Sequence, residues 1–116
     1  MKRTTIIIGE AGSGKSRKAI DLSTSYKSMF CHGLRDFRQD IKTLPTGTEC
    51  IIIEGIEKRD YEEVIKMIKL KSVLVRQKYQ TASKEVDMPI LVFTTLSKAY
   101  REISKEADIE VEIIEL

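Results

Sequence analysis

Residues 4–16, TTIIIGEAGSGKS, constrain the fold of this chain more than any other stretch. The first part, Thr4–Ile8, is a β-branched run that predicts a short buried strand. Three of the six glycines in the chain, Gly9, Gly12 and Gly14, follow at once. Glycines permit unusual dihedral angles and close approach to another group. The N–H groups of such a curled loop point into one concavity, which suits the clustered negative charges of a polyphosphate.

The residues after the glycines complete a phosphate-binding pattern. Gly9, Gly14, Lys15 and Ser16 match every fixed position of G-x-x-x-x-G-K-[ST], and a helix predicted over Lys15–Ser25 follows. We expect the Lys15 ammonium to bridge the β- and γ-phosphates of a nucleotide, and the Ser16 hydroxyl to ligate Mg²⁺. The plainer alternative is a strand-to-helix turn with a surface lysine. The predicted phosphate-binding residues are Gly9, Glu10, Ala11, Gly12, Ser13, Gly14, Lys15, Ser16 and Arg17.

With these residues the chain resembles the P-loop NTPases, in which GEAGSGKS would be the Walker A motif. The resemblance implies ATP and Mg²⁺ as cofactors and a catalytic role for Lys15. It covers the whole chain, because the predicted elements fall in the order expected of that fold.

The rest of the chain alternates apolar runs with helical patterns. Further strands are predicted at Ser28–Cys31, Cys50–Glu54, Pro89–Thr95 and Ile109–Leu116. Helices are predicted at Leu34–Leu44, from Asp60 to about Ser83, and at Ser97–Glu106. This alternation predicts an α/β fold, a three-layer α-β-α sandwich with a five-stranded parallel sheet, in one domain spanning residues 1–116.

The run CIIIEG predicts a second part of the same site. It resembles a Walker B strand, whose final acid lies near Mg²⁺, and here that acid is Glu54. Many members of the family carry Asp and then Glu, whereas this chain has Glu54 and then Gly55. Either Glu54 is the metal-side acid and the base is missing, or Glu54 is the base and Ile53 replaces the metal-side acid. The spacing of Glu57 does not suit the same strand end. We therefore expect nucleotide binding more firmly than fast hydrolysis.

The run PILVFTTL resembles the strand that carries a polar sensor residue in the AAA+ and superfamily 3 helicase-like branch. Thr95, or alternatively Thr94, would hydrogen-bond the attacking water, and Thr95 is our catalytic prediction; the plain alternative is a threonine that ends a strand. That branch implies strand order 5-1-4-3-2. Because the chain ends at Leu116 on its last predicted strand, we expect no helical lid. Arg101 is the best-placed arginine to reach a neighbouring subunit, although a solvated helix arginine is the simpler reading.

Charge and composition limit which binding partners and which cellular compartment can be inferred from the sequence. The net charge of +2 and pI near 8.5 do not argue for nucleic acid by themselves. Basic residues in and around the long predicted helix would suit single-stranded DNA or an acidic partner protein, and a solvated helix face is the default reading. They are Lys58, Arg59, Lys66, Lys69, Lys71, Arg76, Lys78 and Lys84. Cys31 and Cys50 read as buried thiols of a reducing compartment. The N-terminal apolar run is too short for a signal peptide or a membrane span, so we expect a cytoplasmic protein without membrane association.

Three functions remain open at this point. The leading one is a Mg-dependent ATPase of AAA+ or helicase-like type that acts in DNA handling, as a homo-oligomer or with partner subunits. A small-molecule or nucleotide kinase is the second, with Arg35, Asp36 and Arg38 near the acceptor. The third is a nucleotide-binding module that does not hydrolyse, which Gly55 favours.

Overall fold

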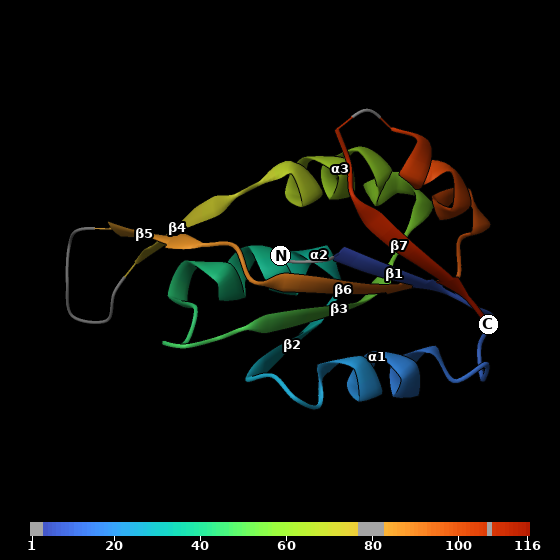
Figure 1. Cartoon of the computed structure of the whole chain (residues 1–116), viewed down its shortest axis with the longest axis horizontal. Coiled ribbons are helices and arrows are strands. Elements are labelled where there is room, and N and C mark those ends of the chain that lie inside the picture. Colours follow the sequence, from blue (N-terminus) through green and yellow to red (C-terminus); the bar gives the residue numbers. More distant parts are fainter. Residues whose placement is uncertain (1–3, 77–82, 107) are drawn as a thin grey trace.

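The computed structural model describes residues 4–76, 83–106 and 108–116. Five strands form a sheet in the order β2-β3-β6-β1-β7, and every neighbouring pair is parallel (Figure 1). Counted within this sheet alone, β6 is the fourth strand and β7 the fifth, so the order read from β7 is 5-1-4-3-2. The labels differ from that expectation because a separate hairpin, β4-β5, precedes β6 in the chain. The five strands are β1 Thr4–Ile8, β2 Ser28–His32, β3 Cys50–Ile56, β6 Ile90–Thr95 and β7 Val111–Glu115.

Helices cover both faces of the sheet, which confirms the three-layer α/β fold. One face packs against α1 (Lys15–Ser23), whose buried Ala19 meets Ile7, Ile52 and Val92. The other face packs against α2 (Gly33–Asp40), α3 (Tyr61–Lys69) and the 3-10 helix η3 (Lys98–Lys105). Figure 1 shows α1 on one side of the sheet and α3 on the other.

The larger core lies on the second face. Alternate strand residues such as Ile6, Ile51 and Phe93 point into it, since successive side chains on a strand face opposite sides. The helices contribute Leu34, Phe37, Val64, Tyr100 and Ile103. There are two short 3-10 turns: η1 (Ile41–Thr43) directly follows α2, and η2 (Lys58–Asp60) directly precedes α3.

The prediction of one long helix from Asp60 to about Ser83 is wrong. α3 ends at Lys69, and the chain then forms β4 (Ser72–Arg76), which pairs antiparallel with β5 (Ser83–Asp87). Residues 77–82, which include Lys78 of the predicted basic residues, lie outside the described residues.

The physical reason lies in the spacing of the apolar residues. Val64, Ile65 and Ile68 follow the helical period, but residues 73–75 are a continuous apolar run that contains the β-branched Val73 and Val75. These β-branched side chains favour a strand, and Val75 is buried there. Figure 1 shows the hairpin projecting from the sheet at the end where the parallel strands begin, opposite to their carboxyl ends.

Candidate functional site

A tight, exposed loop joins β1 to α1 at the carboxyl end of the sheet. Gly12 and Gly14 have φ of 80° and 89°, in the left-handed region that favours glycine. Gly9 is required for a different reason, because a Cβ there would lie 2.3 Å from Ser13 Oγ. Gly14 is the N-cap of α1 and has no side chain, so the first N–H groups of the helix are left for another acceptor. Such a helix start suits an anion.

Lys15 and Ser16 open the helix and make two contacts that bear on the site. The Lys15 ammonium donates to the main-chain oxygen of Glu10, at 3.2 Å, and so folds back over the loop. The Ser16 hydroxyl donates to Glu54 Oε1 at 3.0 Å. This contact joins the first turn of α1 to β3, between residues 38 positions apart in the chain.

The Ser16–Glu54 contact favours one of the two interpretations of the second acid. Glu54 lies next to Ser16, the predicted Mg²⁺ ligand, as a metal-side acid would, whereas Ile53 is fully buried in the larger core on the opposite face. A hydroxyl and a carboxylate within hydrogen-bond distance are oxygen donors of the kind that Mg²⁺ takes, with water and phosphate oxygens in its other positions. The residues present therefore fit this ion.

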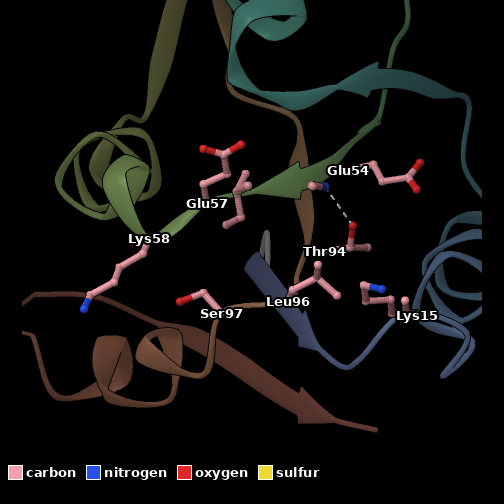
Figure 2. Close-up of a pocket in the computed structure, with 10 residues that line it drawn as sticks. Lys15, Glu54, Glu57, Lys58, Thr94, Leu96 and Ser97 are labelled. Atoms are coloured by element: carbon pink, nitrogen blue, oxygen red, sulfur yellow. Dashed lines mark hydrogen bonds between the residues drawn. The ribbon is translucent and has the colours of Figure 1, made fainter.

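A β-bulge follows at Glu54 and Gly55. β3 pairs with β6 in register up to Ile53 opposite Phe93, and pairing resumes at Ile56 opposite Thr95. Two residues of β3 therefore face Thr94 alone, which re-aims the strand at its end. Gly55 has a φ of 78°, where a glutamate would be strained, and its N–H donates to Thr94 Oγ1 at 3.1 Å (Figure 2).

The two threonines of β6 face opposite ways. Both are fully buried, but Thr94 lines the cavity beside Lys15 and Glu54 and Thr95 does not. The hydroxyl of Thr95, our catalytic prediction, donates to the main-chain oxygen of Ile56 at 2.7 Å and accepts from the Ser97 N–H. The structure therefore corrects the placement of Thr95, since strand alternation turns its hydroxyl away from the cavity that Thr94 faces.

A cavity of about 510 Å³ lies between the glycine loop, the end of β3 and the turn from β6 into η3. In Figure 2, Lys15, Glu54 and Thr94 lie on one side of it, and Glu57, Lys58 and Ser97 on the other. Of the predicted phosphate- and metal-binding residues, Ala11, Lys15 and Glu54 line this cavity. The other lining residues are Gly55, Ile56, Glu57, Lys58, Thr94, Leu96 and Ser97. Sequence reasoning missed Lys58, Leu96 and Ser97, although each comes shortly after a strand end.

The other predicted phosphate-binding residues of the loop do not line this cavity. Glu10 and Arg17 have exposed side chains, and Glu10 contributes its main-chain oxygen to Lys15. Glu57 does line the cavity, but its carboxylate lies 2.6 Å from Arg59 Nε and is well exposed.

A second cavity, of about 580 Å³, adjoins the first and shares Gly55 and Glu57 with it. Two of the proposed acceptor residues, Arg35 and Arg38, line it. The third, Asp36, instead accepts a hydrogen bond from the His32 N–H at 3.2 Å. Arg38 pairs with Glu63; their hydrogen bond raises the pKa of the arginine and lowers that of the glutamate.

The remaining charged residues are dispersed. Arg101 pairs with Glu115 of β7 in the same chain. Lys66 and Lys69 lie on α3, but Arg76 and Lys84 lie on the hairpin, at the other end of the sheet from the loop. The single basic helix face that the sequence predicted is therefore broken by the end of α3.

Across residues 4–76, 83–106 and 108–116, no three His, Cys, Asp or Glu side chains gather as a metal-binding group. Within the same ranges, no helix has the length and apolar character needed to cross a bilayer. The described thiols of Cys31 and Cys50 are both free and buried, as predicted.

Comparisons with known proteins bear on the fold alone. No protein-family model matches the chain, and no curated protein does either. Among solved structures, the chain is similar to the apo A form of the NrS-1 C-terminal region, with a TM-score of 0.57 and 10% identity. The match covers 97% of this chain and 28% of that one, so it spans well under a third of the other chain's length.

Proposed function

We propose that this protein binds Mg-ATP at the loop of residues 9–16 and hydrolyses it slowly. The observation that carries the proposal is the contact between Ser16 and Glu54 directly behind a glycine loop with the full phosphate-binding pattern. A glycine-rich turn with only a structural role has no need of a buried-strand carboxylate beside its serine.

Each residue then has a chemical task. The loop N–H groups and the Lys15 ammonium, turned away from the Glu10 oxygen, bind the phosphates and neutralise charge that develops during transfer. Ser16 and Glu54 would hold Mg²⁺, which when bound withdraws charge from the terminal phosphate. Thr94 already accepts from the Gly55 N–H, so its own proton is free to donate toward the cavity and orient water or a phosphate oxygen. The slow rate follows from Gly55, which supplies no carboxylate to activate water.

The test combines nucleotide titration with phosphate release. We expect Lys15→Ala to weaken ATP binding at least tenfold, and Glu54→Gln to abolish most of the Mg²⁺ dependence. Lys18→Ala, one turn further along α1, is the matched control for the first variant. Glu57→Gln is the control for the second, because that carboxylate lines the same cavity but faces Arg59. Wild-type behaviour of both Lys15→Ala and Glu54→Gln would refute the site.

The wider role that we propose is DNA handling, with the basic residues near the hairpin as the contact surface. Binding of single-stranded DNA should then weaken steeply with salt. The test is fluorescence anisotropy with a labelled oligonucleotide, together with phosphate release with and without that DNA. Lys71→Glu with Lys84→Glu should abolish binding, and light scattering with ATP would show whether copies assemble. We place this activity in the cytoplasm, where buried thiols such as Cys31 stay reduced.

The second cavity favours one alternative, transfer of the terminal phosphoryl group to a small acceptor rather than to water. It opens beside Gly55 and presents Arg35, the residue type that recognises anionic groups. Labelled ATP incubated with a panel of nucleosides and nucleoside monophosphates distinguishes the two. Labelled acceptor would identify a kinase, free phosphate a hydrolase, and neither, despite ATP binding, a non-hydrolysing module.

A further inference from the structure

Hydroxyl groups hold the bulge in β3 on the side that faces β6, while on the other side Glu54 stays paired with His32 of β2. Thr94 Oγ1 accepts from the Gly55 N–H at 3.1 Å, and Thr95 Oγ1 donates to the Ile56 oxygen at 2.7 Å. One residue further on, the Tyr100 hydroxyl donates to the Glu57 oxygen at 2.6 Å. Three consecutive residues of the main chain are therefore fixed by side chains of β6 and η3.

The two donors are placed so that water cannot replace them. Thr95 and Tyr100 are both fully buried. Burial also raises the pKa of Tyr100, so its hydroxyl stays protonated and remains a donor. A buried hydroxyl that is lost leaves its acceptor with a full desolvation cost.

The held segment begins directly after Glu54. Glu54 stays paired with His32 of β2, but the bulge interrupts its register with β6, so the β6 side of the sheet does not by itself set where this carboxylate points. On that side, the hydrogen bonds to Gly55, Ile56 and Glu57 set the path of the main chain directly after Glu54.

We propose that Thr95 and Tyr100 are positioning residues for the Mg²⁺-binding side of the site: their hydroxyls hold the Ile56 and Glu57 carbonyls and thereby keep Glu54 against Ser16. This rests on the proposed function, since it assigns a task to residues behind the same site. We expect these two hydroxyls to affect Mg²⁺ binding and not phosphate binding, because the glycine loop proposed to bind the phosphates lies between β1 and α1.

The test is the Mg²⁺ concentration that gives half-maximal ATP binding, measured beside ATP affinity in EDTA. For Tyr100→Phe and Thr95→Val we expect the Mg²⁺ midpoint to rise about three- to tenfold, the range expected for one lost hydrogen bond. ATP affinity in EDTA should stay within about twofold of wild type, and the Gly55 amide resonance should shift in the nucleotide-free protein. Thr95→Ser, which keeps the hydroxyl, should retain the wild-type midpoint.

Tyr61→Phe is the matched control. Its ring lies 5.4 Å from that of Tyr100, but its hydroxyl bonds Glu106 at the surface, so its Mg²⁺ midpoint should not move. An unchanged midpoint in Tyr100→Phe or Thr95→Val, even with lowered thermal stability, would show a structural role only and overturn the inference. If Tyr100→Phe does not fold, the pair Thr95→Val and Thr95→Ser decides. Wild-type protein without Mg²⁺-dependent ATP binding would instead overturn the proposed function, and the inference with it.

Discussion

Gly9→Ala tests whether the loop must keep its observed path to bind phosphate. Gly9 does not share the positive φ of Gly12 and Gly14, so alanine costs nothing in backbone conformation there. The cost is steric: the new Cβ would lie 2.3 Å from Ser13 Oγ and 3.2 Å from Ser13 Cβ. Rotation of the Ser13 side chain relieves the contact with Oγ, but the contact with Cβ remains tight. The main chain of the loop must therefore shift.

We expect this displacement to cost about 1–3 kcal/mol, the usual range for an added methyl in a filled space, most of it in the bound state where the loop is constrained by phosphate. Mg-ATP affinity should fall about ten- to a hundredfold. Removing the clashing side chain in Gly9→Ala/Ser13→Gly should restore most of the loss. Isothermal titration calorimetry measures the affinities, and thermal unfolding measures the stability of each variant.

Gly47→Ala is the control for a general glycine effect. Gly47 has a φ of 81° in a surface turn, and its added Cβ would meet only Lys27, at 3.7 Å or more. Alanine there should cost about 1–2 kcal/mol in stability and leave ATP binding unchanged. Wild-type affinity in Gly9→Ala, or a loss that Ser13→Gly does not rescue, would refute the steric argument.

Three further predictions concern the site and the stability of the domain. Thr94→Val should lower phosphate release about tenfold or more with little change in ATP affinity, whereas Thr94→Ser should be close to wild type; a coupled enzyme assay checks both. Burial raises the pKa of the Cys31 thiol to about 12 from its ordinary 9.0. The contribution of the neutral thiol to the free energy of unfolding should therefore be fully present below pH 9, and it should fall by up to about 1.4 kcal/mol per pH unit as the pH rises above 9. Urea unfolding at pH 8 and pH 10.5 measures this, and Cys31→Ala should flatten the decline; equal declines in the two proteins would contradict it. Glu63→Gln should cost less than about 1 kcal/mol, because the pair with Arg38 is 39% and 57% exposed at its two ends. Since Arg38 lowers the pKa of Glu63, that contribution should be lost as the pH falls below 4.5, and urea unfolding at pH 7 and pH 3.5 measures it.

Most of the sheet was predictable because its signals are local. Thr4–Ile8 and Cys50–Glu54 are continuous apolar runs bounded by loop residues, and the structure has strands there. The helix predicted beyond Lys69 is wrong because residues 73–75 are a short continuous apolar run, which periodicity alone assigns to neither a helix nor a strand. Only the pairing of β4 with β5 satisfies their main chain as strands.

Within the candidate site, residue types were predictable and their orientations were not. The motif identified Lys15 and Ser16, and an acid after an apolar run identified Glu54. The choice between Thr94 and Thr95 depends on which face of β6 each side chain meets, and a run of two threonines carries no information about that.

By itself, the sequence determined that a glycine-rich loop with a lysine and a serine follows a buried strand, because those residue types and that spacing are local properties of the chain. Only the tertiary structure decided that Glu54 meets Ser16 and that hydroxyls of β6 and η3 hold the bulge beside it. These contacts join residues 38 to 43 positions apart. Their geometry follows from strand order and from a one-residue change of register, which no local pattern encodes.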